Sequence, residues 1–252
     1  MIKVKGINYK INNKEILNNI SFEINKGEIT VLIGPNGTGK TTLMRLITGD
    51  LIANEGEIIF DGKLLKEYTS IELSKKRSYL SQSRNITFPF SAEQIVLMGR
   101  FPHTIDGEYT QNDYEISHEV MKDLNLLSLK KKLYQNLSGG EKSRIDLSRV
   151  FSQMAEYIFL DEPFNQLDPL YISIIIKYLN EIKNNGKTIF LIMHDINLAS
   201  SIADKIILMK NNQIFKFGKP IEVLTYNNLK LLYDIKFKLH KLKDCRYYYE
   251  YI

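Results

Sequence analysis

The segment GPNGTGKT at residues 34–41 constrains this sequence more than any other, because it fits the pattern GxxxxGK[ST]. A short apolar run at 28–33 precedes it and a helix-like stretch at 40–48 follows it. Glycines let the backbone curl around phosphate oxygens, and the amides of the loop and of the helix start favour an anion. Lys40 is suited to reach the β- and γ-phosphates, and Thr41 to ligate Mg²⁺. We therefore predict a strand–loop–helix unit that binds ATP and Mg²⁺.

The alternative interpretation of this segment is a glycine-rich turn that carries a surface lysine. The strand before it and the helix after it make that interpretation unfavourable, because a phosphate-binding loop requires both neighbours. The residues that we assign to nucleotide binding in this loop are Gly34, Pro35, Asn36, Gly37, Thr38, Gly39, Lys40, Thr41 and Thr42.

Strand-like and helix-like stretches alternate along the chain, which indicates an open, mostly parallel α/β sheet. Buried strands are expected at 157–160 and 188–193, and hairpins at 58–65 and 206–217. The stretch from about 88 to 154 contains no good strand, so we expect a helical subdomain inserted between two halves of the sheet. The helix-like stretches are 40–48, 92–98, 113–124, 140–153, 170–184 and 196–203.

Size and composition exclude several classes of protein. The 252 residues suffice for one large α/β domain, and 44% hydrophobic residues exclude a disordered chain. The formal net charge of +5 is too weak and too dispersed to predict a nucleic-acid partner. The single cysteine, Cys245, excludes an intramolecular disulfide. Apolar runs are far shorter than the roughly 20 residues that span a bilayer, so we expect a soluble chain whose membrane role comes through a partner.

Two adjacent carboxylates, Asp161 and Glu162, follow the predicted strand at 157–160. Placing carboxylates at the end of a buried strand costs free energy unless a cation or a water network uses them. Asp161 is suited to hold Mg²⁺ through a water, and Glu162 to act as the general base that orients the attacking water. The alternative is a solvated turn, which Asp and Pro often form. The phosphate loop earlier in the chain favours catalysis.

A histidine, His194, directly follows the predicted strand at 188–193. Open α/β sheets bind their ligands at the carboxyl ends of the strands, so this side chain is placed to hydrogen-bond a γ-phosphate. The alternative is a histidine that only caps the next helix.

The segment LSGGE at 137–141 precedes a stretch of helical periodicity. Ser138 is a good N-cap, and two glycines leave the helix start sterically open, which favours an anion by the dipole argument. One chain needs one γ-phosphate site, so a second one predicts composite sites shared between two copies. The alternative is an ordinary serine-capped helix after a Gly-Gly loop.

Taken in order, these segments resemble the ABC transporter ATPases, and the resemblance covers about residues 7–234. It implies a P-loop NTPase fold with a RecA-like core, an N-terminal antiparallel β subdomain and the inserted helical subdomain, in one ATPase domain at 1–252 with a tail from about 235. The family elements are the Walker A motif at 34–42, the glutamine loop at Gln82, the signature at 137–141, the Walker B motif at 157–162, the D-loop at Leu167-Asp168 and the switch histidine His194.

The resemblance also implies how the protein assembles. Two copies would pair head to tail, with ATP between the phosphate loop of one and the signature of the other. Gln82 would contact Mg²⁺ and link the site to the helical subdomain. Transmembrane permease subunits would bind that subdomain, with a substrate-binding protein as an indirect partner, at the cytoplasmic face of the inner membrane. The residues implied at the composite site are Ser138, Gly139, Gly140, Glu141 and Asp168.

The sequence departs from the family pattern at three places. The fifth signature residue is Glu141 instead of glutamine. The D-loop at 164–168 has the sequence FNQLD, where the family usually has Ser-Ala-Leu-Asp. The aromatic residue that stacks on adenine is open, because Tyr9 is available but the register places Ile11 at that position.

Four segments indicate which class of transporter this chain resembles. The segments at 88–90 (FPF) and 96–103 (VLMGRFPH) are similar to importers of iron chelates and haem. The signature at 137–141 followed by RVFSQ at 149–153 is similar to haem importer ATPases. Siderophore and cobalamin importers remain alternatives. His103 is not expected to ligate haem, because the substrate does not cross this subunit. We expect it to shape the permease groove or to cap a loop.

Three functions are therefore considered for this sequence. The first is the ATPase of an importer for an iron complex. The second is an ABC protein without a transport role, which commonly carries paired ATPase domains, whereas this chain has one of each motif. The third is a regulatory module without turnover, which the intact Lys40, Glu162 and His194 make unfavourable.

Overall fold

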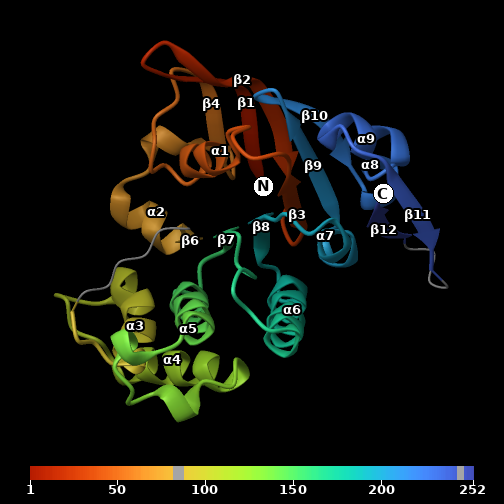
Figure 1. The fold of residues 1–252 in the computed structure, drawn as a ribbon. Helices are drawn as coiled ribbons and strands as arrows, with labels where there is room; N and C mark the ends of the chain where they lie inside the picture. The colour runs from red at the N-terminus through yellow and green to blue at the C-terminus, as the bar shows by residue number, and fades with distance from the viewer. Residues whose placement is uncertain (82–87, 243–246) are drawn as a thin grey trace. The chain divides into compact units, whose positions relative to one another are not determined.

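The computed structural model describes residues 1–81, 88–242 and 247–252. The chain divides into two compact units (Figure 1). The first unit comprises residues 1–68 and 188–252, and the second unit comprises residues 69–187. Gln82 lies outside the described residues.

The first unit contains an antiparallel sheet in the order β2-β1-β4-β5. A two-residue turn joins β1 to β2, and both of its residues, Asn12 and Asn13, have positive φ angles of 46° and 63°. Asparagine tolerates this left-handed conformation, which matches the twist of a hairpin. The N-terminal antiparallel sheet implied by the family resemblance is therefore present. The strands are β1 (Ile2–Ile11), β2 (Lys14–Ile24), β4 (Glu55–Phe60) and β5 (Lys63–Leu64).

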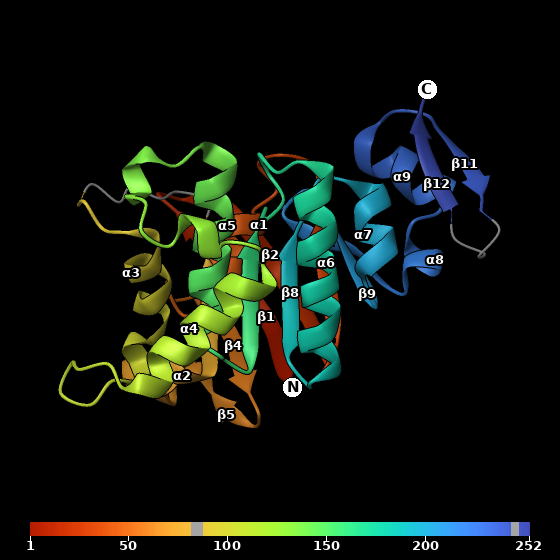
Figure 2. The same ribbon diagram turned by 90° about the horizontal axis from the view of Figure 1, so that it is seen from below.

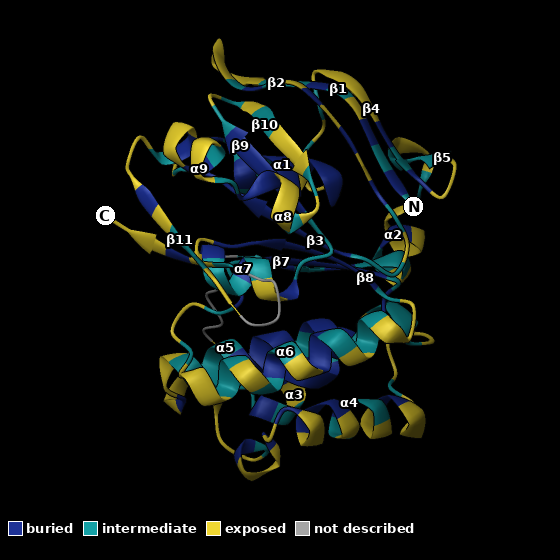
Figure 3. Cartoon of the chain, turned by 90° about the vertical axis from the view of Figure 1, so that its right-hand side faces the viewer, coloured by how far each residue is buried: buried dark blue, intermediate teal, exposed yellow. Residues whose placement is uncertain are grey.

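The first unit also contains parallel strands. β3 (Ile29–Ile33) lies between β8 (Thr188–Ile192) and β9 (Lys205–Lys210) and is parallel to both. Every residue of β3 and β8 is buried (Figure 3), as expected for continuous apolar runs. β10 (Gln213–Gly218) adds to β9 as a hairpin, which confirms the predicted hairpin at 206–217. The phosphate loop follows β3 directly.

Helices and a terminal hairpin complete the first unit. Figure 2 shows the β11–β12 hairpin beside α9, where Phe237 packs against Tyr233 with ring centroids 6.1 Å apart. The elements are α1 (Lys40–Ile47), α7 (Ile196–Ile202), α8 (Pro220–Val223), α9 (Tyr226–Tyr233), β11 (Phe237–Lys241) and β12 (Tyr247–Tyr251).

The second unit combines two parallel strands with helices. β6 (Arg77–Leu80) pairs with β7 (Tyr157–Asp161), and Leu80 lies opposite Leu160. The sequence gives no sign of β6, because its buried Ser78 and its Arg77 interrupt the apolar pattern. The remaining elements are α2 (Ser70–Lys76), α3 (Ala92–Leu97), α4 (Gln111–Asp123), α5 (Gly139–Ser152) and α6 (Pro169–Asn184), with short 3₁₀ turns at Leu65–Glu67 in the first unit and at Met98–His103, Leu127–Leu129 and Tyr134–Asn136 in the second.

Between residues 88 and 154, all of which are described, the structure has helices and isolated bridges but no strand. The predicted helix positions are confirmed to within two residues at each end. The bounds 88–154 for an inserted subdomain stay a prediction, because the compact second unit is larger and includes β6, β7 and α6. Among the residues that the structure describes, no helix is both long and apolar enough to cross a bilayer.

A buried ion pair ties together three parts of the second unit. Arg100 follows α3, and its Nε lies 2.8 Å from Oδ1 of Asp113 in the first turn of α4. Its Nη1 donates to the carbonyl of Ser152 at the end of α5, at 3.0 Å. Burial alone would raise the pKa of Asp113, but hydrogen bonds from Thr110 and Arg100 outweigh it and lower that pKa below its ordinary value of 3.8.

We predict that Asp113→Asn destabilises the chain by about 3 kcal/mol at neutral pH, because it leaves the Arg100 guanidinium buried without its counter-charge. The folded-state pKa of Asp113 lies below its ordinary value of 3.8. The carboxylate therefore stabilises the fold above that pH, and this stabilisation is lost as the pH falls through the folded-state pKa. Urea unfolding at a series of pH values should show the two proteins converging in acid. The control is Asp106→Asn in an exposed loop, which should leave the unfolding midpoint unchanged.

Candidate functional site

The backbone of the phosphate loop is held by close contacts that only glycine permits. Gly39 has a φ of 91°, and a Cβ there would lie 2.7 Å from the carbonyl oxygen of Ile16. A Cβ on Gly34 would lie 2.4 Å from the carbonyl oxygen of Met209. The loop is therefore wedged between β2 and β9, and its shape does not depend on a bound nucleotide.

Lys40 is the first residue of α1 and is almost fully buried. Its Nζ donates to the carbonyl oxygens of Gly34, at 2.8 Å, and Pro35, at 3.0 Å. The ammonium thus lies inside the curve of the loop. Gly39, the N-cap of α1, has no side chain to bond the first helical amides, so the helix start can accept an anion.

His194 lies at the same sheet edge as the phosphate loop. Leu32 of β3 pairs with Ile192 of β8 in parallel register, so Gly34 and His194 each lie two residues beyond a matched pair. His194 is exposed, and the N-cap of α7 is Asp195, whose Oδ1 accepts from the amide of Leu198 at 2.9 Å. The alternative interpretation of His194 as a helix cap is therefore excluded.

A hollow of about 390 Å³ lies beside the outer edge of the phosphate loop. The β9–β10 turn and the end of α9 form its other wall, where Lys210 pairs with Asp234 at 3.2 Å. No sequence pattern places these segments next to the loop, because they are more than 160 residues away along the chain. The lining residues are Pro35, Asn36, Gly37, Thr38, Lys210, Asn211, Asn212, Leu232, Tyr233 and Asp234.

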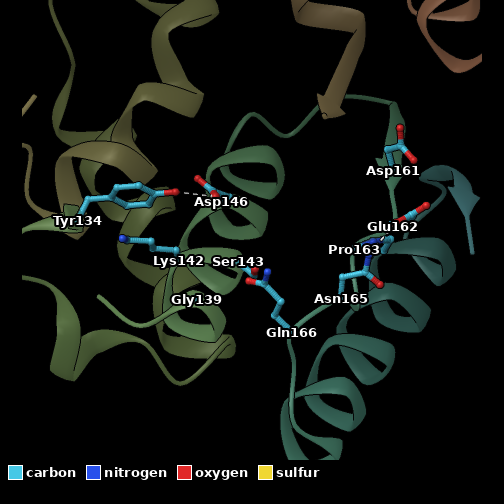
Figure 4. Close-up of a pocket in the computed structure, with 10 residues that line it drawn as sticks. All are labelled: Tyr134, Gly139, Lys142, Ser143, Asp146, Asp161, Glu162, Pro163, Asn165 and Gln166. Carbon is cyan, nitrogen blue, oxygen red and sulfur yellow. Dashed lines mark hydrogen bonds between the residues drawn. The ribbon is translucent and has the colours of Figure 1, made fainter. Parts of the chain in front are cut away.

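The second unit has its own cavity of about 320 Å³, between the start of α5 and the segment that follows β7 (Figure 4). Asp161, the last residue of β7, is 1% exposed. Glu162 follows it with a left-handed φ of 52°. The lining residues are Tyr134, Gly139, Lys142, Ser143, Asp146, Asp161, Glu162, Pro163, Asn165 and Gln166.

Two side chains in the turn after β7 make close contacts. That of Asn165 contacts the Glu162 carboxylate, and that of Gln166 lies against the start of α5. Asn165 donates from Nδ2 to Oε2 of Glu162 at 2.6 Å (Figure 4). Gln166 has a φ of 66°, and its Oε1 lies 2.8 Å from where a Cβ on Gly139 would be. The two D-loop positions that depart from the family pattern therefore contact the predicted base and the signature within one subunit.

The opposite wall of this cavity contains a buried hydrogen bond. Tyr134 donates from its hydroxyl to Oδ2 of Asp146 at 2.8 Å, and both residues are buried (Figure 4). The Nζ of Lys142 lies 5.8 Å from the centre of the Tyr134 ring. No motif spacing marks Tyr134 or Asp146, and Asn165 and Gln166 stand out in the sequence only as D-loop positions that depart from the family pattern.

Glu141, the fifth signature residue, forms a capping box with Ser138 at the start of α5. The amide of Glu141 donates to Oγ of Ser138 at 3.2 Å, and the amide of Ser138 donates to Oε2 of Glu141 at 2.8 Å. This is a capping box, which predicts a well-defined helix start. The backbone hydrogen bond from Ser138 lowers the pKa of Glu141, with Lys132 and Arg144 nearby acting in the same direction. Glu141 is therefore ionised at neutral pH at the start of α5.

The remaining predicted site residues are placed as follows. Asp168 is exposed and is the N-cap of α6. Tyr9 is half-buried in β1 and Ile11 is 48% exposed, so the choice of the adenine-stacking residue stays a prediction. His103 bonds through Nε2 to the carbonyl of Gln153 at 2.9 Å, and burial lowers its pKa. The neutral imidazole thus closes the end of α5.

The chemistry of the predicted magnesium ligands suits that ion. Mg²⁺ prefers oxygen donors and uses one or two protein ligands together with waters and phosphates. Thr41 presents a hydroxyl in the first turn of α1, and Asp161 is a buried carboxylate of the kind that a cation stabilises. Within the described part of the chain, no group of three or more His, Cys, Asp or Glu residues is arranged to hold a metal ion by itself.

The chain was compared with known proteins. The sequence profile of the family described as ABC transporter matches residues 17–165. A hemin import ATP-binding protein from Hahella chejuensis is 32% identical over 242 residues, which cover 93% of each chain. A petrobactin import ATP-binding protein from Bacillus subtilis is 35% identical over 247 residues, which cover 98% of each chain.

Solved structures give the same result for the fold. A metal-chelate type ABC transporter in an inward-facing conformation matches with a TM-score of 0.84 and 26% identity, covering 100% of this chain and 96% of that chain. The dimeric ABC transporter cassette MJ0796 matches with a TM-score of 0.78 and 26% identity, covering 87% of this chain and 99% of that chain. The α/β P-loop fold predicted from the sequence is confirmed.

We predict that Gly140→Ala destabilises the nucleotide-free chain by about 1–2 kcal/mol, although alanine is the better helix former. A Cβ there would lie 2.9 Å from the backbone carbonyl of Gln166, which cannot rotate away. Gly139→Ala should be milder, because its contact is the flexible end of the Gln166 side chain. Urea unfolding measures both. Adding Gln166→Ala should rescue Gly139→Ala and leave the Gly140→Ala loss in place, and rescue of both would contradict the assignment.

Proposed function

Since this chain belongs to the ABC transporter family of ATPases, we propose that it is the MgATP-hydrolysing subunit of an importer for an iron complex, and that this complex is haem. The observation that carries the proposal is the phosphate loop, whose backbone is fixed by glycine contacts around the buried Lys40 ammonium. A preformed ring of amides and one cation suits a triphosphate.

Each predicted site residue has its own role in ATP hydrolysis. Lys40 neutralises the β- and γ-phosphates, and Thr41 and Asp161 hold Mg²⁺, which supplies further charge neutralisation. Glu162 accepts a proton from the water whose oxygen attacks the γ-phosphorus. The bond from the γ-phosphorus to the bridging oxygen breaks, and ADP and phosphate leave. His194 hydrogen-bonds the γ-phosphate from the edge of β8.

Two copies complete the site. The helix start at Ser138 and Gly139 is exposed, and its capping box engages the amides of Ser138 and Glu141, so an anion from a partner would meet the amides of Gly139 and Gly140. The cassette MJ0796, which has a similar fold, is dimeric in its solved structure, and this supports a pairing of two copies. Asp168, which the resemblance places in the D-loop, is exposed at the start of α6.

The transport role rests on relatives and on sequence segments together. Relatives named for hemin import and for petrobactin import both align over more than nine-tenths of the chain. The segments at 88–90 and 96–103 favour an iron complex, and the signature at 137–141 followed by the segment at 149–153 favours haem. In this proposal, permease subunits bind the chain at the cytoplasmic face of the inner membrane, and a substrate-binding protein acts through them.

We predict that Glu162→Gln lowers the ATP turnover of the purified chain about a thousandfold, because the amide cannot accept the proton of the water. The variant should still bind ATP and accumulate as an ATP-bound dimer. Phosphate release and size-exclusion chromatography measure the two effects. Turnover at the parent rate would show that another group orients the water.

We predict that haem delivered by its binding protein raises ATP turnover several-fold when this chain is reconstituted with its permease in liposomes. The substrate is expected to contact the other subunits. A rise in ATP turnover would therefore show that these subunits have bound the substrate and moved against this chain. A ferric siderophore and cobalamin on their binding proteins are the comparison ligands. Stimulation by a siderophore but not by haem would overturn the choice of haem and leave the ATPase assignment unaffected.

A further inference from the structure

The carboxylate of Glu162 is held by a side chain three positions further along the same turn. Nδ2 of Asn165 donates to Oε2 of Glu162 at 2.6 Å. Both residues line the cavity at the end of β7, next to the buried Asp161 (Figure 4). The amide therefore reaches the carboxylate at the place where the sequence predicts the attacking water.

The turn does not depend on this side-chain bond for its shape. The amide of Asn165 donates to the carbonyl of Glu162 at 3.4 Å, and the amide of Leu167 donates to that of Phe164 at 3.3 Å. Pro163 is buried and has a fixed φ. The backbone is thus restrained independently, and the bond from Nδ2 adds a restraint on the orientation of the carboxylate group itself.

Orientation matters for a base whose own backbone is in the left-handed conformation. With a φ of 52°, Glu162 directs its side chain differently from an extended strand residue. A carboxylate on a flexible side chain has free rotation about its terminal bond, and a hydrogen bond to one oxygen fixes the plane in which the other one lies. Amide donors bind carboxylates more strongly than they bind neutral acceptors.

We propose that Asn165 is a positioning residue for Glu162, holding the carboxylate in the orientation in which it accepts the proton of the attacking water. This inference rests on the proposed function, which assigns Glu162 as the base. Asn165 does not contact ATP in this scheme. It acts only through Glu162, so its removal lowers the rate of the chemical step and leaves the binding of ATP unchanged.

The test uses Asn165→Leu in the purified chain, because leucine has nearly the same shape as asparagine and has no donor. We expect kcat for ATP hydrolysis to fall about tenfold with KM for ATP unchanged. Asn165→Asp removes the donor and places a second negative charge beside Glu162, so its kcat should fall further, by about a hundredfold. Asn227→Leu, at an exposed position on α9, is the matched control and should retain the parent kcat.

The same Asn165 substitution made in the Glu162→Gln variant separates a positioning role from a general structural effect. In Glu162→Gln, the carboxylate is absent, so adding Asn165→Leu should change the residual single-turnover rate less than twofold. An equal loss in both backgrounds, a parent kcat for both Asn165 variants, or a raised KM would overturn the inference. If Glu162→Gln alone keeps the parent rate, the base assignment of the proposed function fails instead, which is a distinguishable result.

Discussion

The structure of the first unit depends on the close approach of three backbone segments around the phosphate loop. Gly34 lies against the carbonyl of Met209, and Gly39 lies against the carbonyl of Ile16. Neither position has room for a Cβ, so the loop is held by steric contact and needs no ligand to keep its curve. The buried Lys40 fills the interior of that curve and bonds its carbonyls. An ammonium that is already placed and partly desolvated gains more from a phosphate than a solvated one would.

In the second unit, the turn at the end of β7 is also held by close contacts with a neighbouring segment. A fully buried strand ends in two carboxylates, and the chain then reverses through two residues with positive φ, Glu162 and Gln166. Left-handed residues other than glycine are uncommon, and they concentrate at functional sites where the surroundings hold them. Here the surroundings include the start of α5, whose Gly139 and Gly140 admit the Gln166 side chain and carbonyl. Packing within one subunit therefore requires glycine at 140, where a Cβ would meet the carbonyl of Gln166, whereas Gly139 meets only the flexible end of that side chain.

The helices of the second unit are joined by polar contacts inside an apolar interface. The Arg100–Asp113 pair and the bond from Arg100 to Ser152 connect the ends of α3 and α5 with the start of α4. Gly99, beside Arg100, has its would-be Cβ 2.0 Å from the carbonyl of Arg149, so the segment packs directly on α5. We therefore expect a movement of α5 to shift the segment at 96–103, which resembles that of iron-chelate importers. This connection agrees with the proposed coupling of hydrolysis to a membrane partner.

The sequence by itself determined the family, the order of its motifs and the places of most helices and strands. These follow from local signals: glycine spacing, apolar periodicity and capping residues, which act over a few positions along the chain. It also determined that Asp161 ends a strand and that Ser138 caps a helix, since both depend only on neighbours in the chain. β6 was missed because its stability comes from pairing with β7, and its own residues carry a weak signal.

Only the tertiary structure decided how the side chains of distant or irregular segments meet. That Asp195 and not His194 caps α7, that Asn165 bonds Glu162, and that Gln166 contacts Gly139 all depend on backbone torsions in turns. The hollow beside the phosphate loop likewise joins residues 35–38 to 210–212 through the register of β3 and β9. Motif spacing fixes which residues are present, whereas a left-handed turn or a strand register fixes which atoms come within hydrogen-bond distance.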